Sequence, residues 1–132
     1  MQGLGDFTIT KEYDIQNTIL VVEDDDSIGT LLIDALIMET PYNAMLVTDG
    51  FQALKTMRVQ KPCLVITDYR LPHMDGLELC DRMRAMAEID DVPIIMMSAY
   101  LPKDEAQKRN MACLQKPFEL DDLLDTIQTI LG

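Results

Sequence analysis

Short apolar segments bounded by polar residues are the feature of this sequence that most constrains its fold. Leu64–Ile66 and Ile94–Met97 contain no polar residue at all. Because such runs lack the alternation of a strand with one solvated face, they predict strands buried on both faces, as in a parallel sheet. Together with three further segments, the predicted strands span residues 18–22, 42–48, 63–67, 92–97 and 111–114.

Between these strands the apolar residues recur with the period of a helix. The first helix is predicted to bury Ile28, Leu31, Leu32, Ala35 and Leu36, which follow the spacing i, i+3, i+4, i+7 and i+8. We expect Asp26 or Ser27 to cap its start. The other helices are predicted at residues 50–59, with Phe51 and Leu54 inward, and at residues 76–87, 102–109 and 120–131.

The fivefold alternation of strand and helix predicts one α/β domain. Its sheet is expected to be parallel, with helices on both faces and right-handed crossovers. A length of 132 residues and an apolar content of 48% suit a single hydrophobic core. Residues 1–17 show no useful periodicity, so we predict a flexible N-terminal leader there, with the domain spanning residues 18–132.

Charge and cysteine content narrow the class of protein. The net charge of −12, without any cluster of Lys and Arg, argues against nucleic acids and anionic membranes as partners. The sequence shows neither a signal peptide nor a membrane-spanning run, and we expect a cytoplasmic protein. Cys63, Cys80 and Cys113 lack CxxC spacing, which favours reduced, buried thiols.

Polar residues follow four of the predicted strands. The acidic run Glu23–Asp26 follows the first strand, and Asp68 follows the third. Ser98 and Lys116 follow the fourth and fifth strands. Because ligands of open α/β sheets bind beyond the carboxyl ends of the strands, we expect these side chains to form one site.

The residue types at these strand ends suit phosphoryl chemistry. Glu23, Asp24 and Asp68 would repel one another, and a hard divalent cation, Mg²⁺ or in its place Mn²⁺, would resolve the repulsion. The ammonium group of Lys116 and the hydroxyl of Ser98 suit the oxygens of a phosphoryl group. Asp68 would then be the nucleophile that forms an aspartyl phosphate.

Four motifs carry a resemblance to a known family. VVEDDDS, LVITDYRLPHMDG, IIMMSAY and LQKPF occur in this order within residues 18–131. They resemble the receiver domain of two-component response regulators, including the chemotaxis regulators. The resemblance implies a flavodoxin-like, doubly wound sheet of five parallel strands in the order 2-1-3-4-5.

The resemblance also implies roles for individual residues. Glu23, through water, and Asp24 look like the acidic pair that holds Mg²⁺. Asp68 looks like the phosphoacceptor and a direct metal ligand, and Arg70 supplies a backbone carbonyl to the metal. Ser98 looks like the switch hydroxyl and Lys116 like the phosphate contact, followed by a cis bond to Pro117. A register shifted by one residue, with Asp24 and Asp25 as the pair, remains the alternative.

Two departures from the family pattern concern signal output. Cys113 stands where the family usually has an aromatic residue that moves on activation. The segment between Ser98 and Lys116 is shorter than usual by about four residues, roughly one helical turn, so a shortened fourth helix is expected. Output through another surface, such as the first helix, is therefore a hypothesis. Tyr100 is interpreted either as a surface residue or as a shield of the phosphoryl site.

The leading functional prediction is a phosphorylation-dependent signalling switch that receives its phosphoryl group from a histidine kinase or a phosphotransfer protein. The alternative is a pseudo-receiver that acts as a constitutive interaction module. Turnover of a separate substrate is not expected. A phosphatase of the aspartate-nucleophile type would carry an acid where Arg70 stands, and a flavodoxin would not place an acidic loop against the FMN phosphate.

Overall fold

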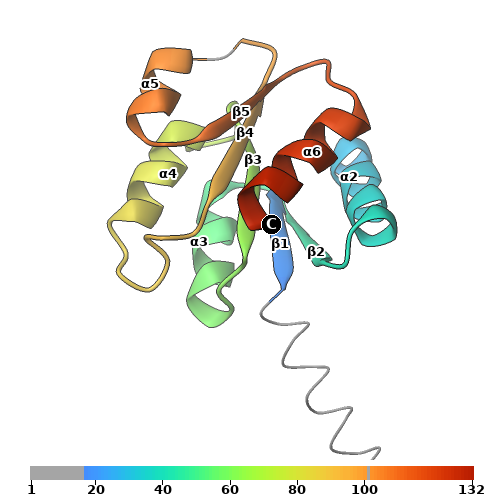
Figure 1. Ribbon diagram of the computed structural model, residues 1–132. Helices are drawn as coiled ribbons and strands as arrows, with labels where there is room; N and C mark the ends of the chain where they lie inside the picture. Colours follow the sequence, from blue (N-terminus) through green and yellow to red (C-terminus); the bar gives the residue numbers. More distant parts are fainter. Residues whose placement is uncertain (1–16, 101) are drawn as a thin grey trace, which may run out of the picture.

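The computed structural model describes residues 17–100 and 102–132, which form a central sheet with helices on both faces (Figure 1). The predicted leader at residues 1–17 lies almost entirely outside the described residues. The strands are β1 (Thr18–Val22), β2 (Asn43–Val47), β3 (Leu64–Asp68), β4 (Ile94–Ser98) and β5 (Ala112–Gln115). The helices are α2 (Asp26–Glu39), α3 (Gly50–Val59), α4 (Gly76–Arg84), α5 (Lys103–Lys108) and α6 (Leu120–Leu131).

The five strands are parallel and lie in the order β2-β1-β3-β4-β5. This confirms the predicted flavodoxin-like, doubly wound fold. The registers Val22↔Thr67 and Asp68↔Met97 align the carboxyl ends of β1, β3 and β4. Every residue of these three strands is buried, as their apolar runs predict, and the burial extends to the polar residues Asp68 and Ser98 at their ends.

Two hydrophobic clusters cover the two faces of the sheet. One joins Leu36 of α2 and Leu123 of α6 to the sheet, and the other joins the sheet to α3, α4 and Ala106 of α5. In Figure 1, α2 and α6 accordingly lie on one side of the sheet and α3 and α4 on the other. Among the described residues, none of the helices has the length and apolar character that crossing a bilayer requires.

The predicted inward face of the first helix is partly wrong. Ile28 is 43% exposed and Leu31 is 71% exposed, whereas Gly29 and Leu36 are buried. Because α2 is apolar around most of its circumference, its periodicity is compatible with more than one buried face. The cap is also different, since the Asp25 side chain, and not Asp26 or Ser27, accepts a hydrogen bond of 3.0 Å from the backbone of Ile28.

Two further expectations about burial need correction. Phe51 is not inward but 50% exposed, and the guanidinium of Arg82 lies 5.5 Å from the centre of its ring. All three cysteines are free, but only Cys80 is fully buried, while Cys63 and Cys113 are partly exposed. In both cases the neighbouring elements, and not the local sequence, decide which side chain is covered.

The helix between β4 and β5 is short, as expected. α5 has six residues and its first turn has no side-chain cap. Arg109, just after it, donates two hydrogen bonds to the carboxylate of Asp81 on α4, at 2.7 and 3.0 Å. These two hydrogen bonds link the C-terminal end of α5 to α4.

Candidate functional site

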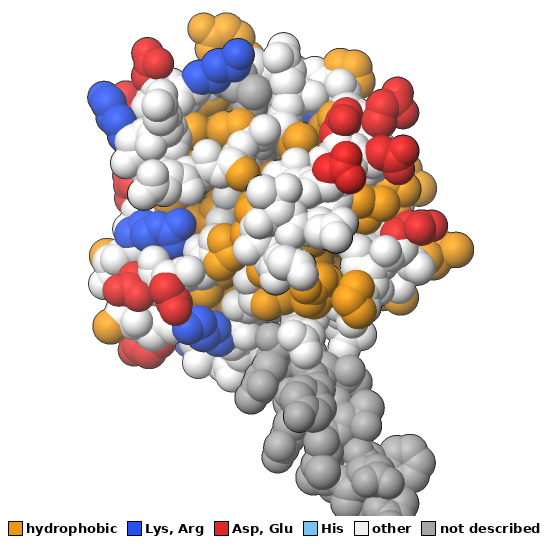
Figure 2. Space-filling model, in the orientation of Figure 1, with side chains coloured by type: hydrophobic (Ala, Val, Ile, Leu, Met, Phe, Trp, Pro, Cys, Tyr) orange, Lys and Arg blue, Asp and Glu red, His pale blue; other side chains and the backbone are white. Residues whose placement is uncertain are grey.

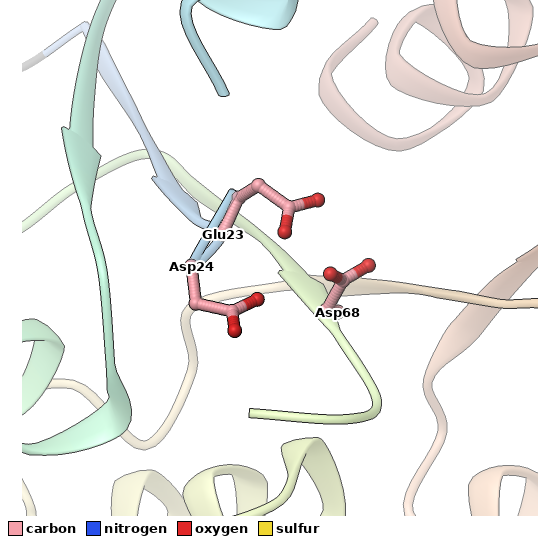
Figure 3. Close-up of side chains that lie close together, drawn as sticks. All are labelled: Glu23, Asp24 and Asp68. Atoms are coloured by element: carbon pink, nitrogen blue, oxygen red, sulfur yellow. The ribbon is translucent and has the colours of Figure 1, made fainter. Parts of the chain in front are cut away.

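Three carboxylates meet at the carboxyl edge of the sheet. Glu23 and Asp24 directly follow β1, and Asp68 is the last residue of β3. One carboxylate oxygen from each lies within 4.8 Å of the others, and Figure 3 shows the three side chains projecting into the same space. Glu23 and Asp68 are buried, whereas Asp24 is exposed, so the cluster opens to solvent on one side.

Among the described residues, one cation faces the two buried carboxylates. Lys116 Nζ lies 2.5 Å from Asp68 Oδ1 and 3.7 Å from Glu23 Oε1. Apart from this ammonium group, neither oxygen has a partner among the described residues. The Lys116 backbone donates a 2.8 Å hydrogen bond to the carbonyl of Ser98, which holds the lysine beside β4. One ammonium therefore balances only part of the charge of three carboxylates.

The pKa values reflect this imbalance. Burial raises the pKa of Glu23 from 4.5 to about 7, and the neighbouring Asp68 carboxylate adds to this shift, while the hydrogen bond from the Asp25 backbone and the charge of Lys116 oppose it. Burial alone would lower the pKa of Lys116, but its hydrogen bond and charge interaction with Asp68 outweigh burial and raise it. The site thus favours taking up a further positive charge, either a proton or a cation.

The donor set fits a divalent hard cation. The three residues offer only oxygen ligands, two of these oxygens are buried with the Lys116 ammonium as their one partner among the described residues, and the exposed side leaves room for water ligands. Mg²⁺ prefers carboxylate oxygens and keeps several waters, and Mn²⁺ shares this preference. The geometry is therefore compatible with the predicted metal ligands Glu23, Asp24 and Asp68.

Ser98 lies at the end of β4, but its hydroxyl is turned toward the loop that follows. It donates a 2.6 Å hydrogen bond to the backbone carbonyl of Tyr100 and accepts a 3.1 Å hydrogen bond from the Tyr100 amide. The Tyr100 side chain is 75% exposed, which favours its interpretation as a surface residue. In this conformation Ser98 therefore holds the chain just before α5.

Two other predicted site positions lie at the margin. Arg70 is exposed in the loop after β3, two residues beyond Asp68, and the role of its backbone carbonyl stays a prediction. Asp25 is the N-cap of α2, and its side chain accepts a hydrogen bond from Ile28. The carboxylates that the structure brings together belong to the register of Glu23 and Asp24, and not to the shifted alternative.

Sequence reasoning missed two residues that support Asp68. The buried Thr67 hydroxyl donates a 2.9 Å hydrogen bond to the Asp68 backbone carbonyl. The Gly76 amide donates to the Tyr69 carbonyl at 2.8 Å, and a Cβ on Gly76 would lie only 2.7 Å from the Asp68 carbonyl oxygen. In the sequence, this close approach is indicated by the glycine that directly follows Asp75, and Asp75 is the N-cap residue of α4.

Gly76→Ala is expected to destabilise the fold by about 1–3 kcal/mol and to weaken Mg²⁺ binding, because the new methyl group must displace the backbone that carries Asp68. Gly29→Ala is the matched control. There the added Cβ meets only the end of the Leu46 side chain, and the substitution raises helix propensity in α2. Urea unfolding and Mg²⁺ titration of both variants test the prediction. Equal effects of the two substitutions would contradict it.

Comparison with known proteins adds independent support for the family. The sequence profile of the response regulator receiver domain matches residues 19–128. Sporulation initiation phosphotransferase F of Bacillus subtilis is 32% identical over 117 residues, which cover 86% of this chain and 92% of the relative.

Two solved structures are also similar to this chain and support the same family. Vibrio cholerae chemotaxis protein CheY4 superposes with a TM-score of 0.80 at 27% identity, covering 87% of this chain and 98% of that one. The receiver domain of the sensor histidine kinase PA1611 of Pseudomonas aeruginosa, solved with a magnesium ion coordinated in its active site cleft, superposes with a TM-score of 0.75 at 30% identity. This match covers 89% of this chain and 98% of that domain.

Proposed function

The chain belongs to the response regulator receiver domain family, and from this premise we propose that it is a phosphorylation-dependent switch whose Asp68 accepts a phosphoryl group from a histidine kinase or a phosphotransfer protein. The observation that carries the proposal is the position of Asp68, which ends a buried strand between two further carboxylates and the ammonium group of Lys116. The proposal also includes a cytoplasmic location for the protein and a histidine kinase or phosphotransfer protein as its partner.

The proposed transfer is an in-line displacement at phosphorus. A carboxylate oxygen of Asp68 forms the new P–O bond while the P–N bond of the donor phosphohistidine breaks, and the leaving imidazole keeps the electron pair. Lys116 contacts the phosphoryl oxygens. Glu23, Asp24, Asp68 and the backbone carbonyl of Arg70 would hold Mg²⁺, which would neutralise part of the phosphoryl charge.

Ser98 would connect the phosphoryl group to the surface. To donate to a phosphoryl oxygen, its hydroxyl must give up the hydrogen bond that it donates to the Tyr100 carbonyl. Because α5 has no side-chain cap of its own, its N-terminal end then loses a support, while Arg109 still fastens the other end to α4. We expect the surface around the start of α5 to change first.

A constitutive interaction module is the second candidate. Cys113, partly exposed beside a groove of about 420 Å³ between α5 and β5, favours it, because a cysteine carries no ring that could transmit a change to this surface. The complete set of Asp68, Ser98 and Lys116 argues against it.

Hydrogen exchange in the presence of Mg²⁺ and beryllofluoride, which imitates a bound phosphoryl group, tests the switch. We expect faster exchange near Tyr100 and the start of α5 in the wild type, a weaker change in Ser98→Ala, and none in Asp68→Asn. Beryllofluoride that binds, as seen by ¹⁹F NMR, without altering exchange at this surface would favour the constitutive module.

A further inference from the structure

A cavity lies between the C-terminal ends of α2 and α6, at the end of the sheet opposite the carboxylate cluster. Its volume of about 320 Å³ is at the small end of the range for small-molecule sites. Its lining includes Glu39, Thr40, Tyr42, Leu124, Ile127 and Gln128. Figure 1 shows these helix ends near the start of β1 and β2, whereas Asp68 lies at the far end of β3. The cavity is therefore separate from the candidate phosphorylation site.

The inner wall of this cavity is apolar. Ile127 is buried in the hydrophobic cluster that covers this face of the sheet, and Tyr42 packs against the same cluster. Leu124 lies three residues before Ile127, on the same side of α6, and is partly exposed. The cavity can therefore cover the apolar part of a ligand.

The rim of the cavity includes the end of α2, where the last three backbone carbonyls have no amide to accept from. Pro41 has no amide hydrogen. The amide of Tyr42 donates to the Thr40 hydroxyl at 3.2 Å. The amide of Asn43 donates to the Asn17 carbonyl at 3.0 Å. Among the described residues, nothing else donates to these three carbonyls, so the rim offers hydrogen-bond acceptors to a ligand.

The charge around this rim is negative. Glu39 is the last residue of α2, where the helix dipole disfavours a carboxylate. Neither α2 nor α6 contains a Lys or Arg, and no ion pair among the described residues involves Glu39. Figure 2 shows carboxylates gathered on the side of α2 and α6, and cations mainly on the side of α4 and α5. A positive charge brought to this rim by a ligand would be stabilised.

We propose that this cavity binds a small organic ammonium compound. Its apolar part would lie against Tyr42, Leu124 and Ile127, and its N–H groups would point to Glu39 and to the last carbonyls of α2. An ammonium group only donates hydrogen bonds, which matches a rim of acceptors. A bare metal ion would leave the apolar wall uncovered, and an anion would be repelled. The inference goes beyond the proposed function, because no residue of the carboxylate cluster takes part.

Titration of the full chain with 2-phenylethylammonium at pH 7, where the amine is charged, tests the proposal by NMR. We expect amide shifts at Thr40, Tyr42 and Gln128 and none around Asp68. The neutral analogue 2-phenylethanol has the same ring and nearly the same length, and we expect it to bind about three- to tenfold more weakly. Equal affinities, or ammonium-induced shifts only around Asp68, would overturn the proposal, as would the absence of any shift.

A pair of charge variants separates the rim from the net charge of the chain. Glu39→Gln is expected to remove most of the difference in affinity between the two probes. Asp34→Asn removes the same charge from an exposed position of α2 outside the cavity, and we expect it to leave the difference intact. Equal effects of the two substitutions would refute a specific role of the rim.

A second pair of variants tests the cavity itself. Gln128→Phe places a ring in the cavity and is expected to abolish the binding of both probes, whereas Thr129→Phe places it on the neighbouring exposed position and is expected to leave binding unchanged. Binding that persists in Gln128→Phe would overturn the location. Asp68→Asn is expected to bind both probes as the wild type does. Loss of ammonium binding in Asp68→Asn would instead assign the ammonium to the carboxylate cluster and overturn the proposal.

Discussion

Replacing Lys116 by methionine is expected to slow the phosphorylation of Asp68 by about a hundredfold or more, the loss typical when a donor to developing negative charge is removed. Methionine keeps much of the length of the side chain but not the ammonium that lies 2.5 Å from Asp68. The measurement is the rate of phosphoryl gain from acetyl phosphate at saturating Mg²⁺. Lys103→Met on α5, outside the carboxylate cluster, is the control and is expected to react normally.

The same substitution should lower stability in the absence of metal. Removing the cation leaves Glu23 and Asp68 buried and uncompensated, at a cost of up to about 3 kcal/mol. Lys116→Met/Asp68→Asn should recover much of this loss, because one of the opposed carboxylates is then gone. A double variant as unstable as Lys116→Met alone would contradict the charge balance described for the site.

Glu23→Gln is expected to stabilise the metal-free protein at pH 8 while weakening its affinity for Mg²⁺. Burial raises the pKa of Glu23 from 4.5 to about 7, so the folded state binds this proton more tightly than the unfolded state. The free energy of unfolding should therefore fall as the pH rises from about 4.5 through about 7, by up to about 3 kcal/mol. Glutamine does not ionise and avoids this loss.

Urea unfolding in EDTA across this pH range measures the effect. The difference in unfolding free energy between Glu23→Gln and the wild type should grow with pH and level off above about pH 7. Glu39→Gln, which makes the same chemical change on the exposed surface of α2, is the control. Added Mg²⁺ should stabilise the wild type more at pH 8 than at pH 5.5, because metal and proton compete for Glu23. A difference that does not vary with pH would contradict the raised pKa.

The fold and the composition of the site were predictable because they depend on local pattern and on one rule of topology. Asp68, Ser98 and Lys116 each follow a short apolar segment, and the carboxyl ends of parallel strands meet at one edge. Once the strands were predicted, the polar residues directly after them could be identified as the candidate site. The cis bond between Lys116 and Pro117, implied by the family resemblance, is also present.

The buried face of α2 could not be predicted in this way. Its apolar residues occupy most sides of the helix, so hydrophobicity does not distinguish Ile28 and Leu31 from Leu36. The buried side of α2 includes Gly29, which has no side chain and lies close to the Leu46 side chain. A glycine contributes nothing to an apolar pattern, and its effect appears only when two elements pack together.

The hydrogen bonds of Ser98 also could not be predicted from the sequence. Its hydroxyl pairs with the Tyr100 backbone, and such a pairing depends on the path of a loop. The close approach of Gly76 to Asp68 has the same origin, since it links the start of α4 to the end of β3. The local sequence pattern predicted the positions of the candidate site residues, whereas the contacts that orient them required the packed structure.

The account depends most directly on whether Asp68 accepts a phosphoryl group. The decisive measurement is intact-mass analysis after incubation with acetyl phosphate and rapid acid quench, with and without Mg²⁺, on the wild type and on Asp68→Asn. We predict a gain of one phosphoryl group in the wild type that requires Mg²⁺ and is absent from the variant. A gain that persists in Asp68→Asn, or that does not depend on Mg²⁺, would contradict the account.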